Sequence, residues 1–156
     1  MEQKELLILH HFRKNARENL KSASKKTGVP ISTIHERLKK YQGTLIKKHT
    51  VLLDFSLLGY ALKVFMVIKA HKKEDVIHFL SHYKQTNSLY RISNGYDIMV
   101  EVLFRDLLQY QQFCDELDTY DIVSKQEYFI LKELKQEEFL SNDLLKQDQF
   151  SQIAQH

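Results

Sequence analysis

The residues best suited to binding a charged partner lie in a short segment around residue 35. Ile34, Leu38 and Tyr41 recur at intervals of four and three, which is the spacing of a buried stripe on a helix. With a rotation of about 100° per residue, the polar residues between them fall on the outer face and its flanks. Hydroxyl groups at the start of a helix and cations near its end suit the DNA major groove, where they reach base edges and phosphates respectively. The predicted DNA-contacting residues of this segment are Ser32, Thr33, His35, Glu36, Arg37, Lys39 and Lys40.

Further cations are concentrated in the same part of the chain. Residues 1–50 hold 12 lysine and arginine residues against 4 acidic residues, a net charge of +8. Residues 51–156 hold 11 against 16, a net charge of −5. A basic head on an acidic body predicts a polyanionic partner for the head, and a solvated charged surface is the alternative. We expect additional phosphate contacts from Lys21, Lys25, Lys26, Lys47 and Lys48.

Side chains with catalytic or metal-binding chemistry are sparse. His78 and His82 are four residues apart on a predicted helix, a spacing that can share a metal ion. No acidic residue stands between them, and no cysteine nearby completes a tetrahedral set. The sequence also has no nucleophile elbow, phosphate-binding loop or dinucleotide fingerprint. We therefore predict a protein that is not an enzyme and has neither catalytic residues nor a metal or cofactor.

The DNA-contacting segment needs a helical scaffold, and the preceding residues supply the signals for one. Residues 5–14 and 20–27 have helical spacing, with Asn19 as a predicted N-cap and Gly28 as the stop. The third helix is predicted to start at Ser32 or Thr33, because Thr33 and Glu36 have capping-box spacing. Residues 44–51 are predicted to form a small β-ribbon or wing. Three short helices and a ribbon predict a winged helix-turn-helix.

The rest of the chain alternates between strand-like and helix-like periods. Strands are predicted over residues 62–70, 88–93, 98–104 and 122–134, and helices over 73–83 and 106–117. The order β-α-β-β-α-β is that of the ferredoxin-like fold. The predicted class is α+β, with a winged helix-turn-helix over 1–51, a linker over 52–61, a ferredoxin-like domain over 62–134 and a C-terminal helical extension over 135–156.

Several short motifs occur in a fixed order through the head. They are Ile8-Leu9, Asn15-Ala16-Arg17, the stretch from Ala23 to Val29, Glu36-Arg37-Leu38, Gly43, and the stretch from Thr50 to Asp54. This order is similar to that of the DNA-binding head of the Lrp/AsnC (feast/famine) family of regulators, in which a βαββαβ domain follows. The resemblance covers nearly all of the chain except about residues 135–156.

The segment Ser93-Asn94-Gly95-Tyr96-Asp97 lies between two predicted strands and contains the turn dipeptide Asn-Gly. On residues alone it is a hairpin turn. It also resembles the T/S-G-x-Y-D loop of the Lrp/AsnC family, although Asn94 stands where the family glycine usually does. Both residue types tolerate positive φ. The resemblance implies an effector site at Ser93, Asn94, Gly95, Tyr96 and Asp97 for a small molecule such as an amino acid.

The resemblance implies a sequence-specific, DNA-binding transcriptional regulator. The expected partners are double-stranded DNA and a second copy of the chain, paired through the sheets, with tetramers and octamers left open. Without an apolar run of membrane-spanning length, we expect no membrane association and a cytoplasmic location. One alternative is a sensing or assembly protein of the same fold that does not bind DNA. Another is a siroheme-decarboxylase-like enzyme, which the single cation of Tyr90-Arg91-Ile92-Ser93 and the absence of tryptophan disfavour.

Overall fold

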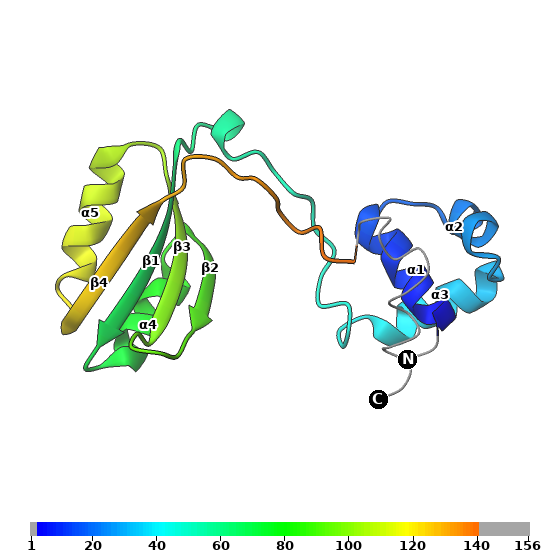
Figure 1. Cartoon of the computed structure of the whole chain (residues 1–156), viewed down its shortest axis with the longest axis horizontal. Helices are drawn as coiled ribbons and strands as arrows, with labels where there is room; N and C mark the ends of the chain where they lie inside the picture. Colours follow the sequence, from blue (N-terminus) through cyan, green and yellow to red (C-terminus); the bar gives the residue numbers. More distant parts are fainter. Residues whose placement is uncertain (1–2, 141–156) are drawn as a thin grey trace. The chain divides into compact units, whose positions relative to one another are not determined.

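The computed structural model describes residues 3–140, which form two compact units. The first comprises the residues up to Leu52 together with those from Leu134 onward, and the second comprises Leu53–Glu133. Figure 1 shows a group of helices in the first unit and a helix-covered sheet in the second. None of the helices in the described part of the chain is long and apolar enough to cross a bilayer.

The head contains helices α1 (Gln3–Lys14), α2 (Leu20–Thr27) and α3 (Ile31–Tyr41). Its core is formed by Ile8, Ala23, Val29 and Ile34, one or more from each helix and the turn. As predicted, the Asn19 side chain caps α2, accepting from the Ser22 N–H at 2.7 Å. Gly28 ends α2 with φ of 69°, a left-handed conformation that costs glycine nothing. The resulting tight turn places α3 against α2.

Helix α3 begins earlier than expected, and the segment that follows it is less regular than expected. It begins at Ile31, and Pro30 occupies the N-cap position, so Thr33 and Glu36 do not form a capping box. The fixed φ of proline already suits entry into a helix. The ribbon predicted over 44–51 is reduced to a single bridge between Gln42 and Ile46. Gly43 turns the chain directly after the helix, and a lone two-stranded ribbon without a core to cover is marginal in water.

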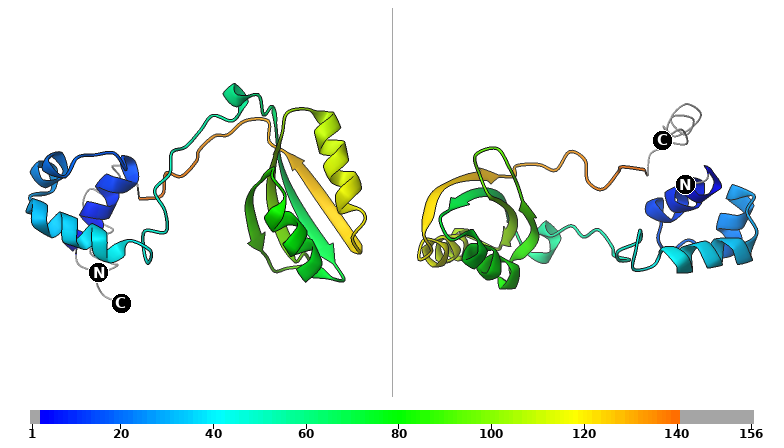
Figure 2. Two further views of the ribbon diagram at one scale, coloured as in Figure 1. Left: turned by 180° about the vertical axis from the view of Figure 1, so that it is seen from behind. Right: turned by 90° about the horizontal axis from the view of Figure 1, so that it is seen from below.

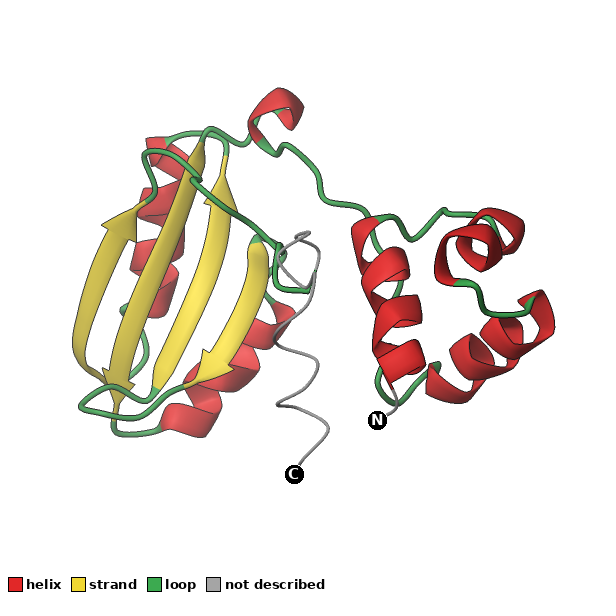
Figure 3. Ribbon diagram, turned by 45° about the vertical axis from the view of Figure 1, so that its right-hand side comes forward, coloured by secondary structure: helices red, strands yellow, loops and turns green. Residues whose placement is uncertain are grey.

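The second unit is a four-stranded antiparallel sheet with strand order β2-β3-β1-β4. Its elements are β1 (Leu62–Ala70), α4 (Lys73–His82), β2 (Thr86–Arg91), β3 (Ile98–Phe104), α5 (Leu107–Leu117) and β4 (Ile122–Phe129). Both helices cover the same face of the sheet (Figures 2 and 3). This confirms the predicted β-α-β-β-α-β order. The core under the helices is formed by alternate strand residues such as Val64, Met66, Val100 and Val102 and by Phe113 of α5.

Two strands are displaced from their predicted bounds because a strand extends only as far as its partner. Strand β4 ends at Phe129 rather than at residue 134, since Phe129 pairs with Val64 and β1 begins only two residues earlier. Strand β2 ends at Arg91 rather than at residue 93, since Arg91 already pairs with Ile98, the first residue of β3.

The C-terminal helical extension expected over 135–156 is not seen in its described part. Residues 135–140 contain no helix, and residues 141–156 lie outside the described part of the chain. The described residues instead contact α1. The His10 Nδ1 donates to the carbonyl oxygen of Leu140 at 2.6 Å, and the Arg13 Nε donates to that of Phe139 at 3.2 Å. The carboxylate of Glu137 pairs with Arg13 as well.

Candidate nucleic-acid interface and effector loop

Helix α3 has one inward and one outward side, as its spacing predicts. Ile34 is fully buried, and Leu38 and Tyr41 are half-buried on the same side. The outward side begins at the second residue of α3 and is formed by the exposed residues Ser32, His35, Glu36, Lys39 and Lys40. Thr33 is half-buried at its edge. The turn therefore presents a continuous polar face of α3 to solvent.

Arg37 does not belong to this outward face. Its guanidinium pairs with the carboxylate of Glu5 on α1, which is only 7% exposed. Burial raises the pKa of Tyr41, and a hydrogen bond from its hydroxyl group to Glu5 raises that pKa further. Arg37 and Tyr41 thus fix α3 to α1 through one buried carboxylate. The prediction that Arg37 contacts DNA overlooked a partner 32 residues away in the sequence.

Lys26 is also occupied inside the head. Its ammonium group pairs with Glu18, whose carboxylate also accepts from the Ser22 hydroxyl at 3.0 Å. The hydrogen bond from Lys26 holds the pKa of Glu18 below its ordinary value, against the opposing effect of burial. By contrast, the remaining predicted lysines are exposed and form no ion pair with any residue the structure describes. They are Lys21, Lys25, Lys39, Lys40, Lys47 and Lys48.

An open hollow of about 410 Å³ lies beside the outward face of α3. Its floor is apolar, with Phe12 from α1 and Leu38 from α3. Its rim carries His35 and Lys39 of α3, together with His49 from the segment expected to form a wing. Ala16 and Gln42 complete the lining. Although residues 44–51 form no ribbon, the chain after α3 still brings a titratable side chain next to the predicted DNA-contacting residues.

The loop between β2 and β3 keeps its turn despite the displaced glycine. Asn94 has φ of 74° and Gly95 has φ of 99°, so both residues adopt the left-handed region. Asparagine is one of the few residues that tolerate this region. The Ile92 N–H donates to the Asp97 carbonyl oxygen at 2.9 Å and closes the loop.

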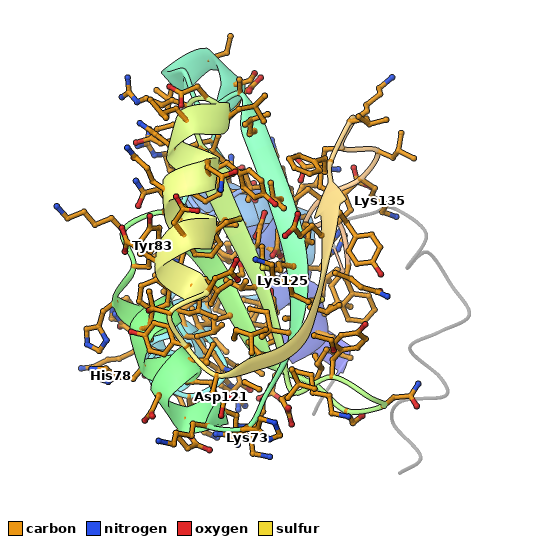
Figure 4. All side chains as sticks on the ribbon, turned by 90° about the vertical axis from the view of Figure 1, so that its left-hand side faces the viewer. Lys73, His78, Tyr83, Asp121, Lys125 and Lys135 are labelled. Atoms are coloured by element: carbon orange, nitrogen blue, oxygen red, sulfur yellow. The ribbon has the colours of Figure 1, made fainter. Side chains whose placement is uncertain are left out.

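Asp97 fastens this loop to the neighbouring elements. Its N–H donates to the Ile68 carbonyl oxygen at 2.9 Å, and its carboxylate accepts from the Ala70 N–H at 3.3 Å. Lys73 lies at the start of α4 (Figure 4). Its ammonium group is 3.5 Å from the same carboxylate. The structure therefore gives Asp97 a local role at the end of β1. Ser93, Asn94 and Gly95 are exposed, and Tyr96 is half-buried.

Comparison with known proteins identifies the family. The family model for the Lrp/AsnC ligand binding domain matches residues 63–140. The HTH-type transcriptional regulator FL11 of Pyrococcus horikoshii is 31% identical over 111 residues, which are 69% of this chain and 74% of that protein. The chain belongs to the Lrp/AsnC family of transcriptional regulators.

Solved structures show the same fold over most of this Lrp/AsnC chain. The regulator NMB0573 of Neisseria meningitidis, in complex with L-Met, has a TM-score of 0.81 at 20% identity and covers 87% of this chain and 93% of its own. The AsnC protein of E. coli has a TM-score of 0.76 at 22% identity, and the match covers 87% of this chain and 95% of that protein. The relative FL11 is an HTH-type transcriptional regulator, in agreement with the prediction that this Lrp/AsnC protein is a regulator and not an enzyme.

The two histidines that could share a metal lie on the exposed side of α4 in this Lrp/AsnC regulator. The His78 and His82 ring centroids are 4.4 Å apart, and the His82 Nδ1 donates to the His78 carbonyl oxygen at 2.8 Å. Within residues 3–140, no group of three metal-binding side chains gathers around them or elsewhere. The sequence did not predict that Glu5, Glu18 and Lys73 contact candidate site residues. Their partners are Arg37, Lys26 and Asp97, and only the tertiary fold brings each pair together.

Proposed function

We propose that this Lrp/AsnC regulator binds double-stranded DNA through the outward face of α3. The observation that carries the proposal is the division of cations within the head: Arg37 and Lys26 are paired with acidic residues of the head, while Lys39 and Lys40 are exposed and have no ion-pair partner among the described residues. Exposed, unpaired cations release counterions when they meet phosphates and so contribute to DNA affinity.

The order of residues along α3 assigns different roles to its two ends. Ser32, Thr33 and His35 at the N-terminal end, with Glu36, are placed to read base edges in a major groove. Lys39 and Lys40 follow, one turn further along, and are placed to contact phosphates. Flanking phosphate contacts come from Lys21, Lys25, Lys47 and Lys48, which are exposed on either side of α3 in the sequence.

The open face of the sheet supports pairing with a second copy. Residues on this face alternate with the buried core residues, and several are apolar. Phe65 pairs with Tyr128, and Val67 pairs with Met99, which in turn pairs with Tyr90. Tyr90 and Tyr128 are each about half exposed. Burying such a face against its own copy yields a symmetric dimer, with two heads for half-sites roughly 34 Å apart.

A small-molecule effector is proposed for the loop of residues 93–97. The match to the ligand binding domain model spans this loop, and a structural neighbour was solved with L-Met. We infer an amino acid as the effector class, with Ser93, Asn94 and Tyr96 as the contacting residues. Asp97, which bonds to the backbone at the end of β1, is assigned to holding the loop in place and not to contacting the effector. Thermal denaturation with each common amino acid tests this: one or more should raise the Tm, and the rise should vanish in Tyr96→Ala.

Selection from a random DNA library with the full chain tests DNA binding directly. The expected result is a pseudo-palindromic site, bound with an affinity that falls steeply as salt rises. If no sequence is enriched and no DNA is retained at low salt, the head does not bind DNA. The alternative of a sensing or assembly protein would then replace the proposal.

A further inference from the structure

One lysine of the sheet lies beside both places where the chain passes between its two units. The chain enters the second unit after Leu52 and leaves it after Glu133. The Lys63 ammonium nitrogen lies 3.0 Å from the carboxylate of Glu133, the last residue before the return. It also lies 6.0 Å from the ring centroid of Phe55, the third residue after the entry. Both connections therefore have a residue in contact with the same side chain.

Lys63 is itself held firmly by the sheet. It is the second residue of β1, and its ammonium nitrogen lies 3.4 Å from the carboxylate of Glu101 on β3. Glu101 is only 6% exposed and also accepts from the Asn87 side-chain amide at 2.7 Å. The register of β2 shifts between Thr86 and Ser88, at the position of Asn87. The lysine is thus paired with one buried carboxylate, in a polar cluster whose other members, Asn87 and Glu133, reach solvent.

The backbone of Lys63 reinforces the second connection. Its carbonyl oxygen accepts from the Ile130 N–H at 2.9 Å, just after the last residue of β4. The chain leading to Glu133 is thus bound to Lys63 at two points, one in the backbone and one in the side chain. The contacts of Lys63 are separate from the hydrophobic core, which lies on the opposite face of the sheet.

The charge of Lys63 is maintained by these neighbours. Burial opposes the charged form, but Glu133 and Glu101 outweigh it, so the pKa of Lys63 lies above its ordinary value. The side chain is only 16% exposed. A cation held between two carboxylates in a partly buried setting is costly to remove, because it leaves a buried carboxylate without its partner.

Another lysine of the same sheet lacks this connection. Lys125 on β4 pairs with Asp118 at 2.6 Å, in the segment between α5 and β4, and its side chain is 23% exposed (Figure 4). Its partner is thus neither Phe55 nor Glu133, the residues next to the two connections. Lys125 resembles Lys63 in burial and pairing and serves as its matched control.

We propose that Lys63 is a positioning residue that fastens both connections between the head and the sheet unit. By holding the residues around Phe55 and Glu133 to one point of the sheet, it shortens the free length of both connections at their ends in the sheet unit. The proposal rests on the proposed function in one respect: the head is taken to be the DNA-reading part. In an assembled regulator the consequence is a preferred spacing between two DNA half-sites.

Hydrogen exchange on the full chain tests the fastening without DNA. In Lys63→Met, the amides of residues 53–60 and 130–133 should both exchange at least about tenfold faster. Glu133→Gln should affect only residues 130–133, and Lys63→Arg should keep most of the protection. Lys125→Met should leave both segments unchanged. Unchanged exchange in Lys63→Met, or a rise in one segment only, overturns the proposal.

DNA binding provides the second readout. The full chain is titrated with selected half-sites, alone and in pairs whose spacing varies one base pair at a time. Lys63→Met should leave the affinity for a single half-site unchanged. The ratio between the affinities at the best and the worst spacing should fall by about tenfold relative to the wild type. An unaltered optimum overturns the positioning role. If the wild type binds no DNA, the proposed function fails, whereas the hydrogen-exchange result still decides the fastening. Should Lys63→Met fail to fold, Lys63→Arg and Glu133→Gln carry the test.

Discussion

The head and the sheet unit use charged residues in opposite ways. In the head, two acidic residues, Glu5 and Glu18, each bind one cation and fix the helices, while the lysines of the outward face have no ion-pair partner within residues 3–140. In the sheet unit, Lys63, Lys73 and Lys125 are all paired with carboxylates. Lys72 and Lys84 of the sheet unit are exposed as well. We therefore expect the DNA interface where cations without ion-pair partners gather on one helix face, as on α3, and not wherever an exposed cation occurs.

Removing an inward-facing cation should damage the stability of the head more than any other single charge change. Arg37→Ala leaves the nearly buried carboxylate of Glu5 without its guanidinium and should cost about 2 kcal/mol of unfolding free energy. The measurement is urea unfolding of the full chain. Lys40→Ala, on the outward side of the same helix, should change stability by less than about 0.5 kcal/mol. Equal effects of the two substitutions would erase the distinction between inward and outward cations.

The pair between Lys26 and Glu18 should make the head sensitive to acid. The pKa of Glu18 is lowered on folding, so its stabilisation is present at neutral pH and is lost as the pH falls through that lowered value. Glu18→Gln should lower the Tm at pH 7 by roughly 2–4 °C, a small effect because the half-exposed Lys26 is screened by solvent. The difference from wild type should shrink on acidification. A difference that grows at low pH would show that Glu18 is not charged in the folded head.

The smallest expected effect concerns the loop of residues 93–97. Asp97→Asn removes the charge that faces Lys73 but keeps an oxygen that can accept from the Ala70 N–H. We expect a loss of about 0.5 kcal/mol in unfolding free energy, with a changed response to amino acids only if the loop moves. Asp121→Asn, another exposed acidic residue of the sheet unit, is the control. A loss of several kcal/mol would mean that Asp97 is far more deeply integrated than its contacts indicate.

The sequence predicted the elements whose signals are local and missed features that depend on distant partners. The Asn19 cap, the Gly28 stop and strand β1 were predicted correctly, since each depends on residues within a few positions. The ribbon over 44–51 was not formed, because a short two-stranded ribbon is marginal in water without a core to cover.

Within the candidate site, the inward and outward sides of α3 followed from the spacing of Ile34, Leu38 and Tyr41. Arg37 and Lys26 are paired with acidic residues of the head, so their assignment to DNA stays a prediction. A cation on the flank of a helix can turn either way. Which way it turns depends on a carboxylate that the fold brings near, as Glu5 is brought to Arg37. No periodicity in the sequence contains that information.

The most direct test of the central claim is the salt dependence of DNA affinity in two charge-matched double variants. Lys39→Ala with Lys40→Ala removes two cations from the outward face of α3, and Lys72→Ala with Lys84→Ala removes two exposed cations from the sheet unit. Fluorescence anisotropy with a selected DNA site gives the affinity at several salt concentrations. The first variant should bind about 10–100-fold more weakly at low salt, with a log–log slope shallower by about 2, and the second should match the wild type. Equal slopes in all three proteins would contradict the assignment of α3 as the DNA-contacting element.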